Sequence, residues 1–461
     1  MRRRVLTPLA ATVLALLGAC ASAPPTSAPA VQTPAQFAQA TATETQPVAE
    51  FWRAFSDAEL DALIAQAMAA NRDLRVAAAR VIEAQAIERG SAGLGRPTLD
   101  VTAGADRTRY AESSGQPGTR NTFAAGIAAT WEIDLLGRVA SEQRAARAGV
   151  EAAEASRHGV QVSVAAEVAR SYFELRGLQE QLRVTRLDLN TQRDALRLVQ
   201  ARLDAGRGTA LDAERARALV EGTAASIPLL ETTLARTRMR LAVLTGVSPA
   251  ALDARLAEQK PLPGLPATPL SSIGSPQTLL QRRPDVAAAE QQLRGAHEQT
   301  AIARSRLWPT LTLNGSLGLN AGRIGDLGSS GSFVGSLGAN LLWAVLDNGQ
   351  RRSQIDVADA RREQALAQYE QAVLAALEDT EGAFVTYSRS QERTERLFAA
   401  AQAAEAAAKI ARARFDAGSI DFLAVLDAER ELLSARDRLA QGQTTAAVSL
   451  VGVYRALAGG W

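Results

Sequence analysis

The sequence holds few of the residues on which most catalytic and metal sites depend. It has one cysteine and two histidines, His158 and His297, in 461 residues. A single cysteine cannot form an intramolecular disulfide, and no metal-ligand pair or Ser/His/Asp arrangement can be read from histidines so far apart. Neither a P-loop nor a GxSxG motif is present. We therefore predict a protein that is not an enzyme and that has no metal site and no cofactor apart from a covalent lipid.

The charge and hydropathy patterns lack the features of two further classes. The 51 basic and 49 acidic residues are interspersed and give a formal charge of only +2, so no nucleic-acid partner is predicted. No run of about eighteen apolar residues occurs, so no transmembrane helix is predicted in the mature chain. Aromatic residues make up 4% and hydrophobic residues 47% of the chain, a composition typical of long helices rich in Ala and Leu.

The N-terminal segment resembles a lipoprotein signal. A start of three arginines precedes an apolar segment, 5–18, that is too short to span a bilayer, and Leu-Gly-Ala-Cys at 17–20 resembles a bacterial lipobox. We expect residues 1–19 to be a signal peptide, Cys20 to carry diacylglycerol and N-palmitoyl groups, and residues 20–50 to be a tether. An ordinary secretory signal with an incidental cysteine is the alternative. No aspartate follows the cysteine, which favours the outer membrane.

Two stretches, 97–135 and 308–346, alternate between apolar and polar residues with the period of a β-strand. The apolar positions are Leu99, Val101, Ala103, Ala105, Phe123, Ile127, Trp131 and Ile133 in the first stretch, and Leu311, Leu313, Leu317, Leu319, Phe333, Leu337, Leu341, Trp343 and Val345 in the second. Each run lasts about ten residues, the length of a tilted strand that crosses a bilayer. We predict one transmembrane β-hairpin in each stretch.

The two halves of the chain repeat one another. Matching positions at a constant offset of 212 (343 − 131 = 212) are Pro97 and Pro309, Trp131 and Trp343, Gly137 and Gly349, and ARLDAG at 201–206 and ARFDAG at 413–418. The motif LDAER at 211–215 recurs at 426–430, an offset of 215, so we expect the second turn to be three residues longer than the first. The pattern predicts an internal duplication.

Helical periodicity fills most of the remaining sequence. We expect shorter helices at 51–96 and 277–307, a crossover at 246–276, long helices at 136–245 and 347–458, and a tail at 459–461. The long segments are expected to turn back near 203–211 and 415–423, where Gly206 and Gly418 suit a helix C-terminus. Leucines at every seventh position predict a coiled-coil seam through Leu175, Leu182, Leu189, Leu196 and Leu203.

Four strands are too few for a membrane sheet without open edges. About eight strands are needed to close a barrel, and an open sheet in lipid leaves backbone groups unsatisfied. The chain is therefore predicted to oligomerise, and the pattern alone does not choose between a dimer and a trimer. The predicted fold class is an internally duplicated α+β membrane protein with long coiled-coil helices.

The order and spacing of several short motifs resemble one known family. The motifs lie at 51–52 through 63–64, 71–74, 131–138, 244–246, 282–286, 412–418, 425–428 and 454–461. From Cys20 to Trp461 the sequence resembles the outer-membrane factor family of TolC-like channels, and within it the NodT-type efflux lipoproteins of resistance-nodulation-division pumps.

The resemblance implies an assembly and a set of partners. It implies a homotrimer with a twelve-stranded transmembrane β-barrel, continued by an α-helical barrel in the periplasm, that acts as a passive conduit for small molecules. A periplasmic adaptor protein and an inner-membrane resistance-nodulation-division pump would be its partners, together with outer-membrane lipid. The adaptor would dock at the helical tips, where Arg202, Gly206, Arg414 and Gly418 match.

The resemblance also implies a periplasmic aperture on the helix after the second tip. The matching residues are Leu423 as an apolar constriction, Asp427 as a carboxylate ring repeated by symmetry, and Arg430 as its partner. Ala424 stands where some members of the family have a second acidic residue, so the ring would be single. The alternative is an ordinary i, i+3 pair of Asp427 and Arg430 on a solvated helix face.

Two other functions fit parts of the sequence. A type I protein-secretion conduit would share the channel architecture, but the lipobox and the motif set favour efflux of small molecules. A structural envelope lipoprotein would explain the heptads and the lipid anchor. It would leave the two alternating hairpins unexplained.

Overall fold

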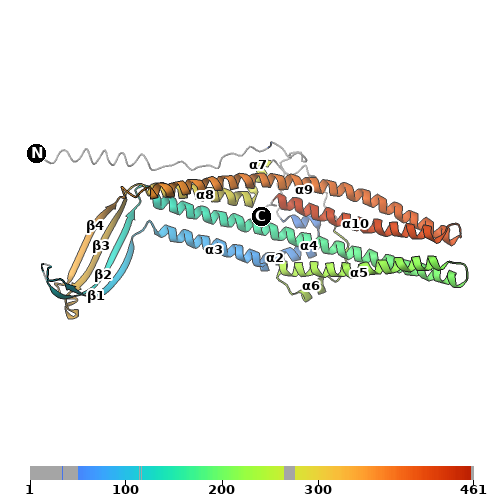
Figure 1. The fold of residues 1–461 in the computed structure, drawn as a ribbon, viewed down its shortest axis with the longest axis horizontal. Coiled ribbons are helices and arrows are strands. Elements are labelled where there is room, and N and C mark those ends of the chain that lie inside the picture. Colours follow the sequence, from blue (N-terminus) through green and yellow to red (C-terminus); the bar gives the residue numbers. More distant parts are fainter. Residues whose placement is uncertain (1–33, 35–49, 114, 116, 264–275, 458–461) are drawn as a thin grey trace. The chain divides into compact units, whose positions relative to one another are not determined.

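The computed structural model describes residue 34 and residues 50–113, 115, 117–263 and 276–457, and these fall into two compact units (Figure 1). The sheet unit comprises Arg80–Glu154 and Ala288–Gln371. The helical unit comprises Val31–Ala79, Ala155–Ala287 and Ala372–Trp461. The predicted signal peptide, the lipidation residue Cys20 and the C-terminal tail lie outside the described residues.

Four antiparallel strands form the sheet. They are β1 (Thr98–Tyr110), β2 (Gly118–Ile133), β3 (Thr310–Ala321) and β4 (Phe333–Leu342), with the short helix η3 (Ile324–Asp326) between the last two. The strand order is β1-β2-β3-β4. The two predicted hairpins are confirmed, and β2 pairs with β3 to join them into one sheet.

The strand register gathers most of the large apolar residues of the four strands on one face. One row across the sheet holds Leu99, Ala129, Gly315 and Leu337, and the next row on that face holds Val101, Ile127, Leu317 and Gly335. The row between them, on the other face, holds Asp100, Ala128, Ser316 and Ser336, and the two serine hydroxyls lie 2.7 Å apart. The alternation predicted for single strands therefore extends across the whole sheet.

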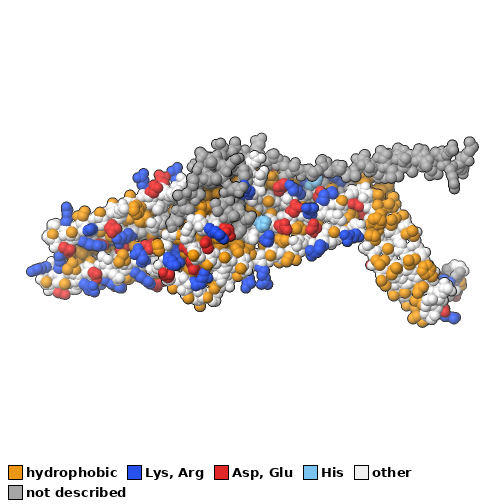
Figure 2. All heavy atoms as spheres, turned by 180° about the vertical axis from the view of Figure 1, so that it is seen from behind, with side chains coloured by type: hydrophobic (Ala, Val, Ile, Leu, Met, Phe, Trp, Pro, Cys, Tyr) orange, Lys and Arg blue, Asp and Glu red, His pale blue; other side chains and the backbone are white. Residues whose placement is uncertain are grey.

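The apolar face is not covered by any of the residues that the structure describes. Leu337 is 91% exposed and Val101 is 82% exposed. Hydrophobic side chains dominate the part of the sheet that is visible in Figure 2, whereas charged side chains are frequent over the helices. An apolar surface of this kind is unfavourable in water and favourable against lipid.

The end of β4 corrects the prediction for the second hairpin. Trp343 and Val345 were expected on the apolar face of the strand, but β4 ends at Leu342. Its partner β3 begins at Thr310, directly after Pro309, whose nitrogen carries no hydrogen to extend the ladder. Strand β2 continues to Ile133 because it also pairs with β3.

The two tryptophans nevertheless make the same contact in both halves. The indole nitrogen of Trp131 donates to the carbonyl oxygen of Gly95 over 3.1 Å, and that of Trp343 donates to the carbonyl oxygen of Leu307 over 3.0 Å. Both the donors and the acceptors keep the offset of the sequence repeat (343 − 131 = 307 − 95). The duplication therefore extends to individual hydrogen bonds.

The helices include four that exceed thirty residues. The elements are η1 (Phe51–Phe55), α2 (Ala58–Ala70), α3 (Arg72–Gly93), α4 (Arg138–Asp204), α5 (Ala210–Thr245), α6 (Pro249–Leu256), α7 (Pro276–Arg282), α8 (Pro284–Ser305), α9 (Gln350–Asp416) and α10 (Phe422–Ala456). Within the described ranges, none of the helices has the length and hydropathy needed to span a membrane.

An aromatic cluster forms the core of the helical unit. The rings of Phe51 and Tyr454 stack with centroids 4.9 Å apart, and those of Phe55 and Phe173 lie 4.7 Å apart. This cluster brings together η1, α4 and α10, which are far apart in the sequence. Because aromatic side chains bury large apolar areas, this cluster contributes strongly to the core of the helical unit.

The predicted leucine seam is buried. Leu175, Leu182 and Leu189 of α4 are at most 5% exposed, and Leu196 and Leu203 pack partly buried against a second cluster at the helix tips. The seam therefore packs as a coiled-coil pattern predicts.

The connections between the long helices correct a second prediction. The first tip comprises residues 205–209 and the second tip residues 417–421, so the second is not three residues longer. The offset of 212 holds for the ends of α4 and α9, at Asp204 and Asp416. It also holds for the starts of α5 and α10, at Ala210 and Phe422. The three extra residues therefore lie within 422–425, in the first turn of α10, which lengthens that helix by about one turn before its LDAER motif.

Candidate functional site

The first tip is closed by a Schellman motif. Gly206 has a φ of +69°, and its amide donates to the carbonyl oxygen of Leu203 over 2.9 Å. The amide of Arg207 donates to the carbonyl oxygen of Arg202 over 2.8 Å. These two bonds satisfy the last carbonyls of α4, and the positive φ is the reason for glycine at this position.

The second tip repeats this motif bond for bond. Gly418 has a φ of +71°, and its amide donates to the carbonyl oxygen of Phe415 over 2.9 Å. The amide of Ser419 donates to the carbonyl oxygen of Arg414, also over 2.9 Å. Arg202 and Arg414, which the resemblance assigned to adaptor docking, therefore occupy the same position in the two motifs.

The helices that leave the tips begin differently. Thr209 caps α5, since its hydroxyl accepts from the amide of Asp212 over 3.1 Å and donates to the Asp212 carboxylate over 2.6 Å. Asp421 caps α10 by accepting from the amide of Ala424 over 3.1 Å. The Asp212 carboxylate is thus held by the hydroxyl of the residue that caps α5.

Because α10 has an extra turn, Asp427 makes no such contact with the residue that caps its helix. Asp427 is the counterpart of Asp212 in the LDAER motif, but it lies six residues after its helix cap instead of three. Its side chain is exposed. Among the ion pairs of the described residues, none engages Asp427, so the alternative of an i, i+3 pair with Arg430 is not formed within the protomer.

The three residues that the resemblance assigns to an aperture share one face of α10. Leu423, Asp427 and Arg430 have the i, i+4, i+7 spacing of a helix face, and all three are exposed, Leu423 to 39%. The neighbouring face, with Phe422, Val425 and Leu426, is buried among the tip helices. A single helix therefore combines an anchored apolar face with an exposed face that carries a carboxylate and a guanidinium.

The two tips are held together by contacts of aromatic side chains that the sequence analysis did not predict. The Arg202 guanidinium lies 4.0 Å from the centroid of the Phe415 ring, and the Phe415 and Phe422 centroids are 5.4 Å apart. Phe415 replaces Leu203 of the first repeat, and Phe422 lies in the turn that the first repeat lacks. The sequence feature that could have predicted this contact is the presence of two aromatic residues that the first repeat lacks, in a chain with few aromatic residues.

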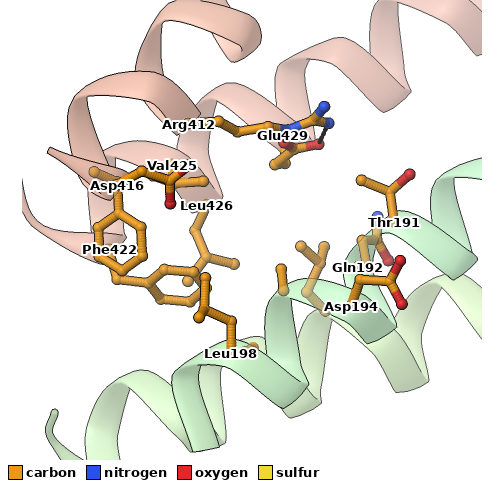
Figure 3. Close-up of a pocket in the computed structure, with 14 residues that line it drawn as sticks. Thr191, Gln192, Asp194, Leu198, Arg412, Asp416, Phe422, Val425, Leu426 and Glu429 are labelled. Atoms are coloured by element: carbon orange, nitrogen blue, oxygen red, sulfur yellow. Dashed lines mark hydrogen bonds and ion pairs between the residues drawn. The ribbon is translucent and has the colours of Figure 1, made fainter. Parts of the chain in front are cut away.

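A cavity of about 250 Å³ remains beside these aromatic rings (Figure 3). Four helices line it, with Leu198 and Gln192 from α4, Phe415 from α9 and Leu426 from α10 among the contributors. Arg412 and Glu429 form an ion pair at its edge, and the hydrogen bond to Glu429 raises the pKa of Arg412.

A buried ion pair joins α4 to α10 further along. Arg436 donates to the Asp188 carboxylate over 2.8 Å and lies 3.4 Å from that of Glu405. Asp188 is 7% exposed, and burial raises the pKa of this carboxyl even though Arg436 opposes the shift. The pair connects α10 to α4, further along α10 than Leu423, Asp427 and Arg430.

The outer strands of the sheet each have one neighbour. Within the described sheet, β1 pairs with β2 and β4 pairs with β3, so each outer strand presents a second edge of unpaired backbone groups. Such edges bind further strands.

A duplicated chain with paired long helices and one four-stranded sheet with an exposed apolar face defines the class of outer-membrane export channels. The sequence profile of the outer membrane efflux protein family matches residues 63–247 and 275–459, two segments related by the offset of the sequence repeat (275 − 63 = 212). The chain belongs to this family. It is an outer-membrane channel of efflux pump systems and not an enzyme.

Similar proteins cover almost the whole chain. The pyoverdine export outer membrane protein OpmQ of Pseudomonas aeruginosa is 34% identical, over 97% of this chain and 95% of its own length. The probable outer membrane lipoprotein SilC of Salmonella typhimurium is 28% identical, over 98% of this chain and 97% of its own length. The solved structure of the outer-membrane channel OprN is 37% identical, with a TM-score of 0.88 over 94% of this chain and 99% of that one.

Proposed function

We propose that three copies of this chain form a passive conduit that exports small molecules through the outer membrane. The observation that carries the proposal is the sheet with one continuous apolar face and two open edges. Three such sheets would supply twelve strands, which is enough to close a barrel with a water-filled lumen. Small-molecule cargo is supported by the family assignment and by the export of pyoverdine in the name of OpmQ.

A reconstruction of the detergent-extracted particle by electron microscopy tests this assembly. A hollow particle with three-fold symmetry is expected. A two-fold particle or a monomer would contradict the trimer, and a solid rod would favour a structural lipoprotein.

The tips are proposed to dock a periplasmic adaptor, through which an inner-membrane resistance-nodulation-division pump would deliver cargo. This is supported by two equivalent turns, each with an arginine at the same place in its Schellman motif, namely Arg202 and Arg414. Substitution of Gly418 by valine would strain the positive φ and distort the second tip. We expect lost crosslinking to the adaptor with retained membrane insertion, and unchanged crosslinking would count against docking at this tip.

Leu423, Asp427 and Arg430 are proposed to form the periplasmic aperture, with Asp427 as a carboxylate ring in the trimer. The proposal is supported by the exposure of these side chains on one face of α10 and by the absence of a capping role for Asp427. Carboxylates brought together by three-fold symmetry would repel one another and attract cations. Arg430 of a neighbouring copy is the proposed counter-charge.

A matched pair of variants tests the aperture. Asp427→Ala is expected to raise the leak conductance of the purified channel in planar bilayers and the sensitivity of cells to large antibiotics. Asp212→Ala removes the same side chain from the equivalent motif, where it breaks the hydrogen bond from the Thr209 hydroxyl to the carboxylate but keeps the backbone amide that Thr209 caps. Equal conductance of Asp427→Ala and the parent channel would remove Asp427 from the gate.

Cys20 is proposed to carry the diacylglycerol and N-palmitoyl groups. The proposal is supported by the lipobox sequence and by the lipoprotein relative SilC. Cys20→Ser should lose incorporation of labelled palmitate while the channel still assembles, because the strands themselves anchor the protein. Labelled palmitate in the variant would refute the assignment.

A further inference from the structure

Two arginines bound the apolar face of the sheet at one end. Over six successive rows, from Leu311 to Ala321 on β3, the strand register places no polar side chain on this face. The next row holds Arg107 of β1 beside Asn121 of β2, and Arg109 lies in the row beyond it. The six rows, which we call the apolar band, therefore end directly at two guanidinium groups.

The two faces of the sheet differ in the sign of their charges. The strands contain six charged residues, and the two on the apolar face are Arg107 and Arg109. The opposite face carries Asp100, Asp106, Arg120 and Glu132. Asp106 points away from its neighbour Arg107, because its Oδ2 lies 3.8 Å from where a Cβ on Gly104 would stand, on that opposite face. Every carboxylate of the strands thus faces away from the two arginines.

The chain supplies no counter-charge to these arginines. Both side chains are exposed, and neither takes part in an ion pair among the residues that the structure describes. The carboxylates of the neighbouring turns, Glu112 and Asp326, are exposed and form no ion pair with them. Positions two apart on a strand lie about 7 Å from one another, so the two cations repel each other. An anion bound between them relieves that repulsion.

The height of the apolar band places the arginines at the level of lipid headgroups. Leu311 and Ala321 are ten residues apart on β3 (321 − 311 = 10). With a rise of about 3.4 Å per residue and a tilt of about 40°, these residues span about 26 Å along the membrane normal, which matches the apolar height of a transmembrane barrel. Arg107 then lies about 5 Å beyond the band and Arg109 about 10 Å beyond it, in the headgroup layer.

We propose that Arg107 and Arg109 bind the phosphomonoester group of a membrane lipid. Such a group carries three acceptor oxygens and about two negative charges, so one guanidinium can bind it in a bidentate manner while the second binds the remaining oxygen. The acyl chains of the same lipid lie against the apolar band. Because the band continues directly into the arginine rows, a phosphate that carries acyl chains makes both contacts, whereas free phosphate makes only one.

The leaflet in which this lipid lies rests on the proposed function. Helix α3 ends at Gly93 and β1 begins at Thr98, so the helices join the sheet at the end of β1 opposite Arg109. In the proposed conduit the helices extend into the periplasm, and the arginines then face the outer leaflet. The ligand is therefore a phosphorylated lipid of the outer leaflet.

Native mass spectrometry of the full-length channel in detergent measures the binding of single lipids. Titrations compare dioleoyl phosphatidic acid, which has a phosphomonoester, with dioleoyl phosphatidylcholine, which has a zwitterionic phosphodiester, and with dioleoylglycerol, which has no phosphate. We expect phosphatidic acid to bind at least about tenfold more tightly than phosphatidylcholine, at one tight site per chain. Dioleoylglycerol should bind least. The count per chain can be read whatever the number of chains in the particle.

Three variants locate the site. Arg107→Gln combined with Arg109→Gln should lower the affinity for phosphatidic acid to that for phosphatidylcholine. Arg120→Gln is the matched control, because Arg120 pairs with Thr108 at the same level of the sheet but on the opposite face, and it should bind as the parent does. Arg107→Lys combined with Arg109→Lys keeps the charge without the bidentate geometry and should retain an intermediate affinity.

Three results would overturn the proposal. Equal affinity of the parent for phosphatidic acid and phosphatidylcholine would show lipid contact without a phosphomonoester site. A loss in Arg120→Gln as large as that in the double glutamine variant would show an effect of total charge and not of this site. Displacement of phosphatidic acid by an equal concentration of inorganic phosphate would show that the acyl chains contribute nothing.

The leaflet is tested separately, so that a failure of the proposed function can be told from a failure of the lipid site. Ser113→Cys places a thiol in the turn between β1 and β2, and a membrane-impermeant maleimide should label it in intact cells. The parent, with Cys20 alone, is the control. Absence of labelling would overturn the outer leaflet and the orientation of the conduit, while the lipid titrations would still decide the site.

Discussion

Replacement of Arg283 by methionine should destabilise the helical unit strongly. Arg283 lies between α7 and α8 and is 9% exposed. Its guanidinium donates to the carbonyl oxygen of Ala456 near the end of α10 over 2.8 Å, to Asp285 over 2.7 and 3.0 Å, and to Asp379 of α9 over 3.3 Å. One side chain thus connects three helices of the unit.

The expected loss follows from the groups that the substitution leaves behind. Breaking a buried ion pair by removing one partner costs about 3–5 kcal/mol. Here Asp285 is half-exposed, and Asp379 keeps a second cation, Arg455, at 3.2 Å, so both carboxylates are partly compensated. The Ala456 carbonyl loses its side-chain donor. We expect a loss of about 2–3 kcal/mol in the free energy of unfolding.

Denaturant unfolding of the detergent-solubilised protein, followed by circular dichroism, measures this loss. Arg282→Met is the matched control, because Arg282 is the adjacent arginine and is exposed. Its effect should stay within about 0.5 kcal/mol, as is usual for surface positions. If Arg283→Met were no more destabilising than Arg282→Met, the network would not have the role that we assign to it.

The pH dependence of the same variant gives a second test. Burial raises the pKa of Asp285, but the hydrogen bonds and the charge of Arg283 outweigh it and leave that pKa below its ordinary value. Its contribution to stability is therefore present above about pH 4 and is lost as the pH falls through the lowered folded-state pKa. In Arg283→Met this acid-dependent loss should be smaller than in the parent protein.

Two further substitutions have matched controls in the chain. A Cβ on Gly177 would clash with Thr444, whose own Cβ would lie only 2.9 Å away. Gly177→Ala should therefore separate α4 from α10 and lower the melting temperature. The control is Gly222→Ala, whose Cβ would meet nothing within 4 Å and which should raise the melting temperature slightly. Trp343→Phe removes the donor to the Leu307 carbonyl and should cost about 1 kcal/mol, and Trp131→Phe should cost the same because it breaks the equivalent bond. Unequal losses from the two tryptophan variants would contradict the equivalence of the halves.

The sequence carried enough information to predict the hairpins and the duplication. A period of two over several residues is a local property of the chain, and the repeat of Trp131 at Trp343 needs no structure to be seen. The end of β4 was missed because it depends on a neighbour: the ladder stops where Pro309 precedes the partner strand. Strand ends in a sheet are set by pairing as well as by pattern.

The site was predictable only in part. The Schellman glycines and Asp427 could be identified from motifs, since they recur at fixed distances. The longer second turn was a wrong inference from the same motifs, because counting residues does not reveal where a helix begins. Asp421, a good capping residue before an apolar run, was the overlooked signal. The cavity depends on how four helices pack around Phe415 and Phe422, and no linear pattern reports such packing.

The duplication provides an internal comparison for the proposed aperture. Both tips end in the same Schellman motif, so differences beyond them arise from the sequence that follows. In the first half the aspartate of the LDAER motif, Asp212, is held by Thr209 in a helix cap. In the second half Asp421 provides the cap, and the extra turn that carries Leu423 and Phe422 moves Asp427 beyond its reach. One added turn therefore accounts for an exposed carboxylate, an exposed leucine and an aromatic wall of the cavity at the same helix end, which supports the proposed aperture in the second half of the chain.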